Sequence, residues 1–124
     1  MFAHELHHCA RWDGPGYGKT LGEVLVSEGL AGHFVQEIYG PPLEPWESVP
    51  GPVLHLHLAE AQAEWDSRDY EHSRWFFGSS DLPRWLGYSL GFQIVDRYLA
   101  ETGASAAGQA HFAAAGFRPS LDRM

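Results

Sequence analysis

The chain has 124 residues, of which 44% are hydrophobic and 14% aromatic, and its formal net charge is −8 at pH 7 with histidine neutral. This length and apolar content suffice for a single compact domain, residues 1–124, with a hydrophobic core. The negative charge and the lack of a lysine and arginine cluster argue against nucleic acid or an anionic membrane as partner. A single cysteine excludes an internal disulfide. Without a signal-peptide pattern or an apolar run of about 18 residues, a cytoplasmic protein is the default expectation.

The first predicted helix carries a His-Glu-x-x-His motif at residues 4–8 and ends at the Asp-Gly-Pro-Gly sequence of residues 13–16. A helix turns about 100° per residue, so His4 and His8 lie on one face, where both imidazoles can reach a single ion. Glu5 is turned roughly 100° from His4, which suits a carboxylate that activates water and does not ligate the metal. The motif therefore predicts a zinc site with Glu5 as general base.

A zinc peptidase site of this kind needs a third protein ligand. The metzincin pattern is excluded, because its glycine and third histidine are absent at the required spacing after the second motif histidine. The next predicted helix begins with a capping box at residues 20–23 and ends before Gly-Pro-Pro at residues 40–42. Glu28 falls within its apolar stripe, where an unpaired carboxylate would be costly. Zinc would be a partner for Glu28, and the alternative is an ion pair with Arg11 or Lys19.

The middle of the chain is predicted to hold a connector and a further helix. Residues 41–52 contain five prolines and Trp46, so we expect an extended surface connector that is a candidate lid over the cleft. Residues 53–58 alternate like a strand, but residues 59–64 continue with strong helix formers. This continuation favours one helix across both segments.

A last long helix is expected to follow the Ser-Asp-Leu-Pro sequence of residues 80–83, with Ser80 or Asp81 as its cap and the proline in its first turn. It should run to Gly103. Two glycines four residues apart, Gly87 and Gly91, give this helix a smooth face, which we expect to pack on the metal-binding helix. One short helix is expected in the alanine-rich tail.

Three segments of the chain, residues 4–11, 25–31 and 85–92, together resemble a known family. They are similar to an uncharacterised bacterial family of predicted zinc-dependent proteases in the gluzincin clan, and the similarity runs from residue 3 to about residue 103. The resemblance implies a zincin-like, mainly α-helical core with one Zn²⁺ per chain. It also implies a peptide or protein substrate.

The resemblance assigns roles to individual residues. It implies three metal ligands: His4, His8 and Glu28. Glu5 would be the general base, as the motif also predicts. Gluzincins further place a tyrosine or histidine opposite the base to stabilise the oxyanion of the tetrahedral intermediate. Tyr88 is the first candidate for that position, and His72 is the second.

The segment before the motif departs from the family pattern. Gluzincin-like domains have a small sheet ahead of the metal-binding helix, and its edge strand pairs with the substrate backbone, whereas only three residues precede His4 here. We therefore expect little or no sheet and a chain truncated at its N-terminus relative to the family; a lost segment would also have carried any targeting signal. The leading interpretation is an active zinc metalloprotease. The alternatives are a zinc-binding, non-catalytic interaction or regulatory module derived from a protease, and a metal-free helical protein.

Overall fold

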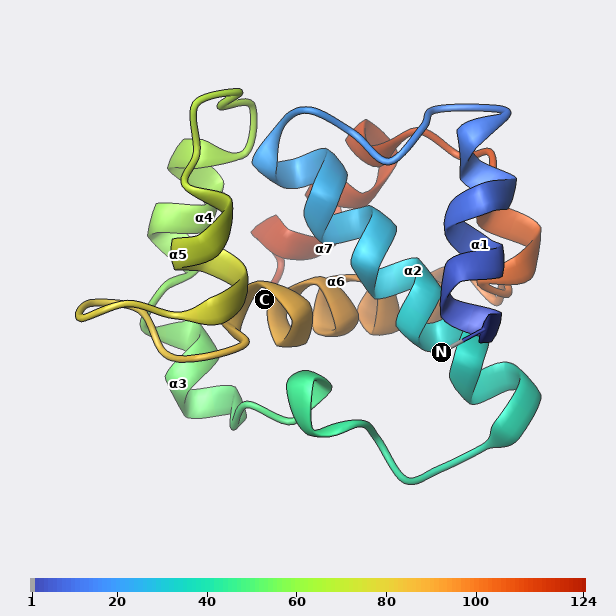
Figure 1. Ribbon diagram of the computed structural model, residues 1–124, viewed down its shortest axis with the longest axis horizontal. Helices are drawn as coiled ribbons and strands as arrows, with labels where there is room; N and C mark the ends of the chain where they lie inside the picture. Colours follow the sequence, from blue (N-terminus) through green and yellow to red (C-terminus); the bar gives the residue numbers. More distant parts are fainter. Residues whose placement is uncertain (1) are drawn as a thin grey trace.

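The computed structural model describes residues 2–124 as helices joined by loops (Figure 1). The α-helices are α1 (Phe2–Trp12), α2 (Leu21–Tyr39), α3 (Gly51–His55), α4 (Leu58–Glu64), α5 (His72–Phe77), α6 (Leu86–Thr102) and α7 (Arg118–Asp122). The 3₁₀ turns are η1 (Pro45–Glu47), η2 (Ala107–Gln109) and η3 (Ala114–Phe117). No strand occurs within residues 2–124, which confirms the expected mainly α-helical fold with little or no sheet. In this same range, none of the helices combines the length and apolarity needed to cross a bilayer.

Helices α1 and α2 begin and end close to where local signals predict. The amide nitrogens of Gly14 and Gly16 both donate to the carbonyl of Arg11, which closes α1 just past the motif. Thr20 and Glu23 form the predicted capping box of α2, since each side chain accepts a hydrogen bond from the backbone amide of the other residue. These two helices carry every predicted metal ligand.

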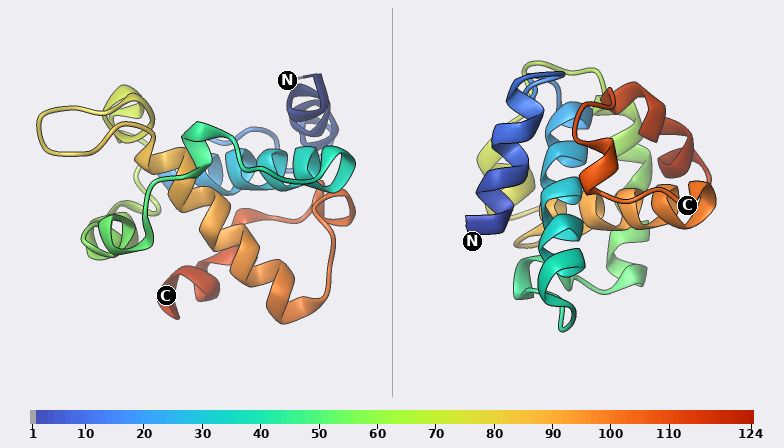
Figure 2. Two further views of the ribbon diagram at one scale, coloured as in Figure 1. Left: turned by 90° about the horizontal axis from the view of Figure 1, so that it is seen from below. Right: turned by 90° about the vertical axis from the view of Figure 1, so that its right-hand side faces the viewer.

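Helix α2 lies at the centre of the fold, with α1 on one side and α6 crossing it on the other (Figure 2). The two crossing helices approach closely because glycines meet there: a Cβ atom added to Gly29 would lie 2.2 Å from the carbonyl oxygen of Gly91. The expectation that the glycine face of the last helix packs on the metal-binding helix is therefore wrong. Its partner is α2, which supplies the complementary glycine. Glu28 thus lies in the helix that contacts both α1 and α6.

The start of α6 differs from the prediction. Asp81 does not cap a helix, because its carboxylate accepts hydrogen bonds from the Arg74 guanidinium and the Ser79 hydroxyl. The chain instead makes a turn, and α6 begins at Leu86 after Trp85, whose backbone is left-handed with φ 67°. The predicted end at Gly103 is confirmed, with φ 72° at that glycine.

Two other segments are divided into more helical elements than predicted. The helix expected over residues 53–64 is divided at residues 56–57 into α3 and α4. The tail contains η2, η3 and α7 where one short helix was expected.

The connector of residues 41–52 is docked onto the helices through η1. The Ser89 hydroxyl of α6 donates to the carbonyl of Trp46 at 2.9 Å and accepts from the amide of Val49 at 3.0 Å. The Glu47 side chain is buried against Gly32 of α2. The connector thus forms a wall beside α2 and α6, and most of its residues are exposed as expected.

Candidate metal centre

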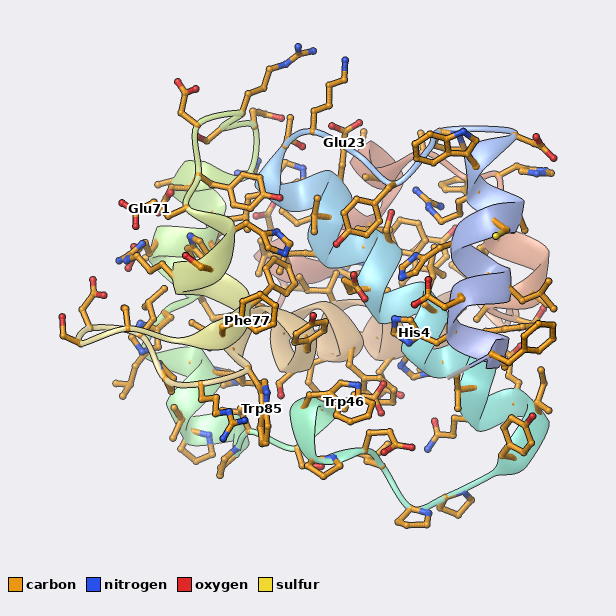
Figure 3. The ribbon with its side chains drawn as sticks, viewed as in Figure 1. His4, Glu23, Trp46, Glu71, Phe77 and Trp85 are labelled. Atoms are coloured by element: carbon orange, nitrogen blue, oxygen red, sulfur yellow. The ribbon has the colours of Figure 1, made fainter. Side chains whose placement is uncertain are left out.

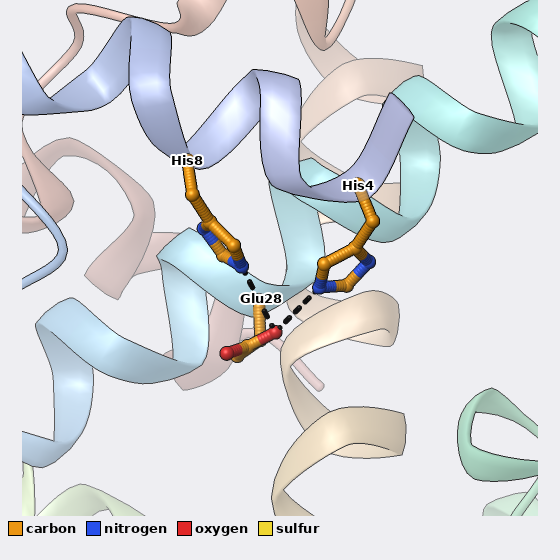
Figure 4. Close-up of side chains that lie close together, drawn as sticks. All are labelled: His4, His8 and Glu28. Atoms are coloured by element: carbon orange, nitrogen blue, oxygen red, sulfur yellow. Dashed lines mark hydrogen bonds and ion pairs between the residues drawn. The ribbon is translucent and has the colours of Figure 1, made fainter. Parts of the chain in front are cut away.

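Helices α1 and α2 bring the three predicted ligands to one point (Figure 4). Nε2 of His4 lies 2.8 Å from Oε1 of Glu28, and Nε2 of His8 lies 3.3 Å from the same oxygen. One potential ligand atom from each of the three residues falls within 4.8 Å of the others. The four-residue spacing of the histidines places both rings on the face of α1 that meets α2. Glu28 is 24 residues from His4 and 20 residues from His8 in the chain, and the packing of α1 on α2 brings the three together.

Glu28 is a buried but ionised carboxylate, with 8% of its surface exposed. Burial disfavours the charged form, but hydrogen bonds with His4, His8 and Tyr17 outweigh it and hold the pKa of Glu28 at about 2. The alternative ion pair with Arg11 is not formed, because that guanidinium bonds to Ser27 and to backbone carbonyls of the C-terminal segment. A buried negative charge that faces two imidazoles is a favourable site for binding a cation.

Tyr17 holds the second oxygen of the Glu28 carboxylate. Its hydroxyl donates to Oε2 at 2.7 Å, while Oε1 faces the two histidines. Burial and the nearby negative charge of Glu28 raise the pKa of Tyr17, so its hydroxyl stays protonated as a donor. The Tyr17 carbonyl accepts from the Ser27 hydroxyl at 2.7 Å, and Nε of Arg11 donates to that hydroxyl at 3.1 Å. Each oxygen of Glu28 therefore has its own fixed partners.

The sequence interpretation missed Tyr17. It lies in the loop between α1 and α2, flanked by Gly16 and Gly18, whose positive φ values of 80° and 114° turn the chain back toward α2. A tyrosine between two glycines, shortly after a metal motif, is a weak signal that the loop returns to the site. Such a loop has no hydrophobic repeat, so periodicity in the sequence does not single it out.

A cleft of about 710 Å³ opens beside the three candidate ligands. Glu5 and Tyr88 also line it, so the predicted base and the first oxyanion candidate share the cleft with the ligands. Burial, together with the negative charges of Glu28 and Glu5, raises the pKa of Tyr88. The Tyr88 hydroxyl is therefore protonated at neutral pH.

His72 is not brought into the cleft. Its ring stacks on Phe76 with centroids 4.6 Å apart, and its Nδ1 lies 3.3 Å from the Tyr70 hydroxyl. Helix α5 has only six residues, and the His72 ring packs on its own next turn. The second oxyanion candidate is therefore directed at Phe76.

Two further histidines near the site bond to backbone instead of facing the ligands. Nε2 of His7 lies 2.8 Å from the carbonyl oxygen of Ala106, and Nε2 of His33 lies 3.0 Å from that of Phe92. Burial lowers the pKa of both rings. They contribute to the packing of α1 and α2 as neutral groups.

Comparison with known proteins assigns the family. The model of the family described as "Predicted Zn-dependent protease (DUF2268)" matches residues 1–117. The chain belongs to this family. It is also 32% identical over 116 residues to the uncharacterized protein YjaZ of Bacillus subtilis (strain 168), an alignment that covers 86% of this chain. The chain spans 44% of the length of that relative. No solved structure matches the chain.

The membership confirms the family resemblance, and the donor set agrees with the zinc in the family description. Two imidazole nitrogens and one carboxylate oxygen are the His₂Glu set that zinc-dependent hydrolases use, with a further position left for water. The candidate ligands are themselves largely buried and border an open cleft. His4, His8 and Glu28 are therefore chemically and sterically suited to hold one Zn²⁺.

Proposed function

We propose that the chain is a zinc metallopeptidase of the gluzincin type, in which His4, His8 and Glu28 hold one Zn²⁺ and Glu5 is the general base. The observation that carries this proposal is the convergence of two imidazoles and a buried, ionised carboxylate beside a cleft that Glu5 also lines. Three metal ligands and a nearby carboxylate base are the groups that metal-assisted hydrolysis of a carbonyl requires. Membership of a family described as predicted Zn-dependent proteases supports the same class.

The proposed mechanism distributes the chemistry among named side chains. Bound zinc supplies Lewis-acid catalysis, since it acidifies water and polarises a peptide carbonyl. Glu5, exposed to the cleft, accepts the proton of the attacking water and passes it to the leaving amine. Tyr88 is a protonated donor on the same cleft, and we assign it to the developing oxyanion.

Tyr17 acts in this proposal as a positioning residue. Its hydroxyl restrains Oε2 of Glu28, so Oε1 stays directed at the two histidine nitrogens. Outer partners of this kind orient metal ligands and tune their affinity.

Zinc content and peptide cleavage, measured on the same preparations, test the proposal. Wild type should hold about one zinc per chain, and Glu28→Ala should lose it. Glu5→Gln should keep the zinc but lose roughly 10²- to 10⁴-fold of the cleavage rate on an unfolded protein substrate. His55→Gln, exposed and outside the cleft, serves as the matched control and should retain both properties. Full cleavage by Glu5→Gln, or no zinc after reconstitution, would contradict the proposal.

The alternative, a zinc-binding module without catalysis that binds a partner, is favoured by the exposed apolar side chains of Phe2 and Leu6 on α1. It predicts the same zinc stoichiometry in wild type and Glu5→Gln but no cleavage by either. The experiment above therefore separates the two functions.

A further inference from the structure

We propose that Trp46, Phe77 and Trp85 form a subsite for a bulky apolar side chain of the substrate, beside the peptide bond that is cleaved. The inference rests on the proposed peptidase function and names its substrate class. We refer to these three residues as the aromatic end of the cleft.

The aromatic end belongs to the same cleft as the candidate ligands. All three rings line it together with His4 and Glu28, although they come from η1, the end of α5 and the residue before α6. Figure 3 shows Phe77 and Trp85 to the left of His4, with Trp46 between Trp85 and His4. A side chain held by these rings would belong to a peptide whose backbone runs past the metal-binding residues.

The volume of the cleft exceeds what a metal ion and a water molecule require. At about 710 Å³, it falls within the roughly 300–1,000 Å³ of typical small-ligand sites. Such sites are lined mainly by apolar and aromatic side chains, with a few polar groups that fix orientation. Here the candidate ligands supply polar groups, and Trp12 of α1 is a further ring in the lining. The rings of Trp46, Phe77 and Trp85 lie on the side away from His4 (Figure 3).

The three rings leave apolar surface open to the cleft. Phe77 is 58% exposed, and both tryptophans are only partly buried. Exposed rings that gather around one cavity, instead of being scattered over the surface, mark a site of apolar contact. A ligand that covers them removes their apolar surface from water, which favours binding.

The backbones of both tryptophans are anchored at the same helix, α6. Trp85 has the one positive φ among the non-glycine residues of 2–124. This conformation is unfavourable for a bulky residue and is typical of functional positions. The Arg84 guanidinium lies 4.1 Å from the ring centroid of Trp85. Ser89, one turn later in α6, holds the carbonyl of Trp46 at 2.9 Å. The backbones of both residues are therefore held in place before substrate arrives.

The third ring contacts another ring of the cleft. Phe77 meets Tyr88, the oxyanion candidate, edge to face with centroids 6.3 Å apart. This contact joins the aromatic end to a residue of the proposed catalytic site. A side chain bound at the rings would therefore position the neighbouring carbonyl near Tyr88.

Binding of two zinc-directed probes tests the subsite without relying on turnover. N-acetyl-phenylalanyl hydroxamate and N-acetyl-glycyl hydroxamate share the metal-binding group and differ in the side chain. Calorimetric titration of the zinc-loaded chain should give tighter binding of the phenylalanyl probe, on the order of 10- to 100-fold. Peptide cleavage sites mapped by mass spectrometry should show bulky apolar residues at one flanking position.

Variants then locate the preference. Trp85→Gly removes the ring and suits the positive φ, so it tests the side chain without adding backbone strain. It should bring the ratio of the two affinities close to one, and Trp46→Ala should lower it independently. Trp85→Phe should keep part of the preference. Tyr39→Ala, an exposed aromatic outside the cleft, is the matched control and should leave the ratio unchanged.

The outcomes distinguish this inference from the proposed function. Equal binding of the two probes, or a preference that survives both tryptophan variants, would overturn the subsite while zinc content and the Glu5→Gln assay still decide the peptidase. If the chain holds no zinc, the peptidase proposal fails and the subsite falls with it.

Discussion

The cleft has a metal-binding end, formed by the candidate ligands His4, His8 and Glu28, and an aromatic end. Different forces hold the residues of these two ends in place. At the metal-binding end, buried groups are fixed by short hydrogen bonds, such as those of Glu28 with His4 and Tyr17. At the aromatic end, Trp46 and Trp85 are half-buried and are fixed through their backbones. The hydrogen bonds at the metal-binding end depend on exact donor and acceptor positions, so this end should tolerate few substitutions. The aromatic end depends on apolar surface and should tolerate conservative replacement.

The largest expected effect on the free energy of unfolding comes from the charge of Glu28. The pKa of Glu28 is lowered from 4.5 to about 2, so its ionised form stabilises the folded state above pH 4.5, and this stabilisation is lost as the pH falls toward 2. At about 1.4 kcal/mol per pKa unit, the loss is roughly 3 kcal/mol. In metal-free protein, Glu28→Gln should reduce this part of the acid dependence. Urea unfolding at pH 6, 4 and 2.5 measures it.

Glu71→Gln is the control for the acid series, since it makes the same exchange at an exposed residue with no side-chain hydrogen bond or ion pair within residues 2–124. It should leave the pH dependence close to that of wild type. If the free energy of unfolding changed with pH equally in Glu28→Gln and in wild type, Glu28 would not be an ionised, hydrogen-bonded carboxylate in the folded chain.

A second prediction concerns the contact that joins the two ends, since α2 carries Glu28 and α6 follows Trp85. A Cβ atom at Gly29 would lie 2.2 Å from the Gly91 carbonyl oxygen, so Gly29→Ala should force the helices apart and cost about 2–3 kcal/mol. Thermal unfolding measures the change. Gly51→Ala is the control, because nothing lies within 4 Å of its added Cβ atom. Equal stability of the two variants would contradict the close packing of α2 on α6.

The smallest effect is expected from Tyr17→Phe, which removes one hydrogen bond to a charged group and keeps the ring. The metal-free protein should lose about 1.5 kcal/mol of stability, and zinc affinity should fall roughly 10-fold. Competition with a chelator measures the affinity. Tyr98→Phe, whose hydroxyl bonds to Gln109 away from the site, should leave zinc affinity unchanged. An unaltered affinity in Tyr17→Phe would show that Glu28 needs no outer partner.

Local signals sufficed for the helices that carry the candidate ligands. The Thr20–Glu23 capping box and the glycines after α1 act within a few residues, so the bounds of α1 and α2 could be predicted. The start of α6 could not, because the potential cap Asp81 is engaged by Arg74. A salt bridge with another helix is invisible to a local rule.

The sequence by itself determined the ligand trio as a candidate and the helices that bear it, because four-residue spacing and a carboxylate in an apolar stripe follow from helix geometry and the cost of burying charge. Only the tertiary structure decided how these groups meet. In the folded chain, Tyr17 bonds to Glu28 and the His72 ring stacks on Phe76. Helix α2 packs between α1 and α6, and three rings line one end of the cleft. Those contacts join residues far apart in the chain and depend on how the elements pack, which no local pattern encodes.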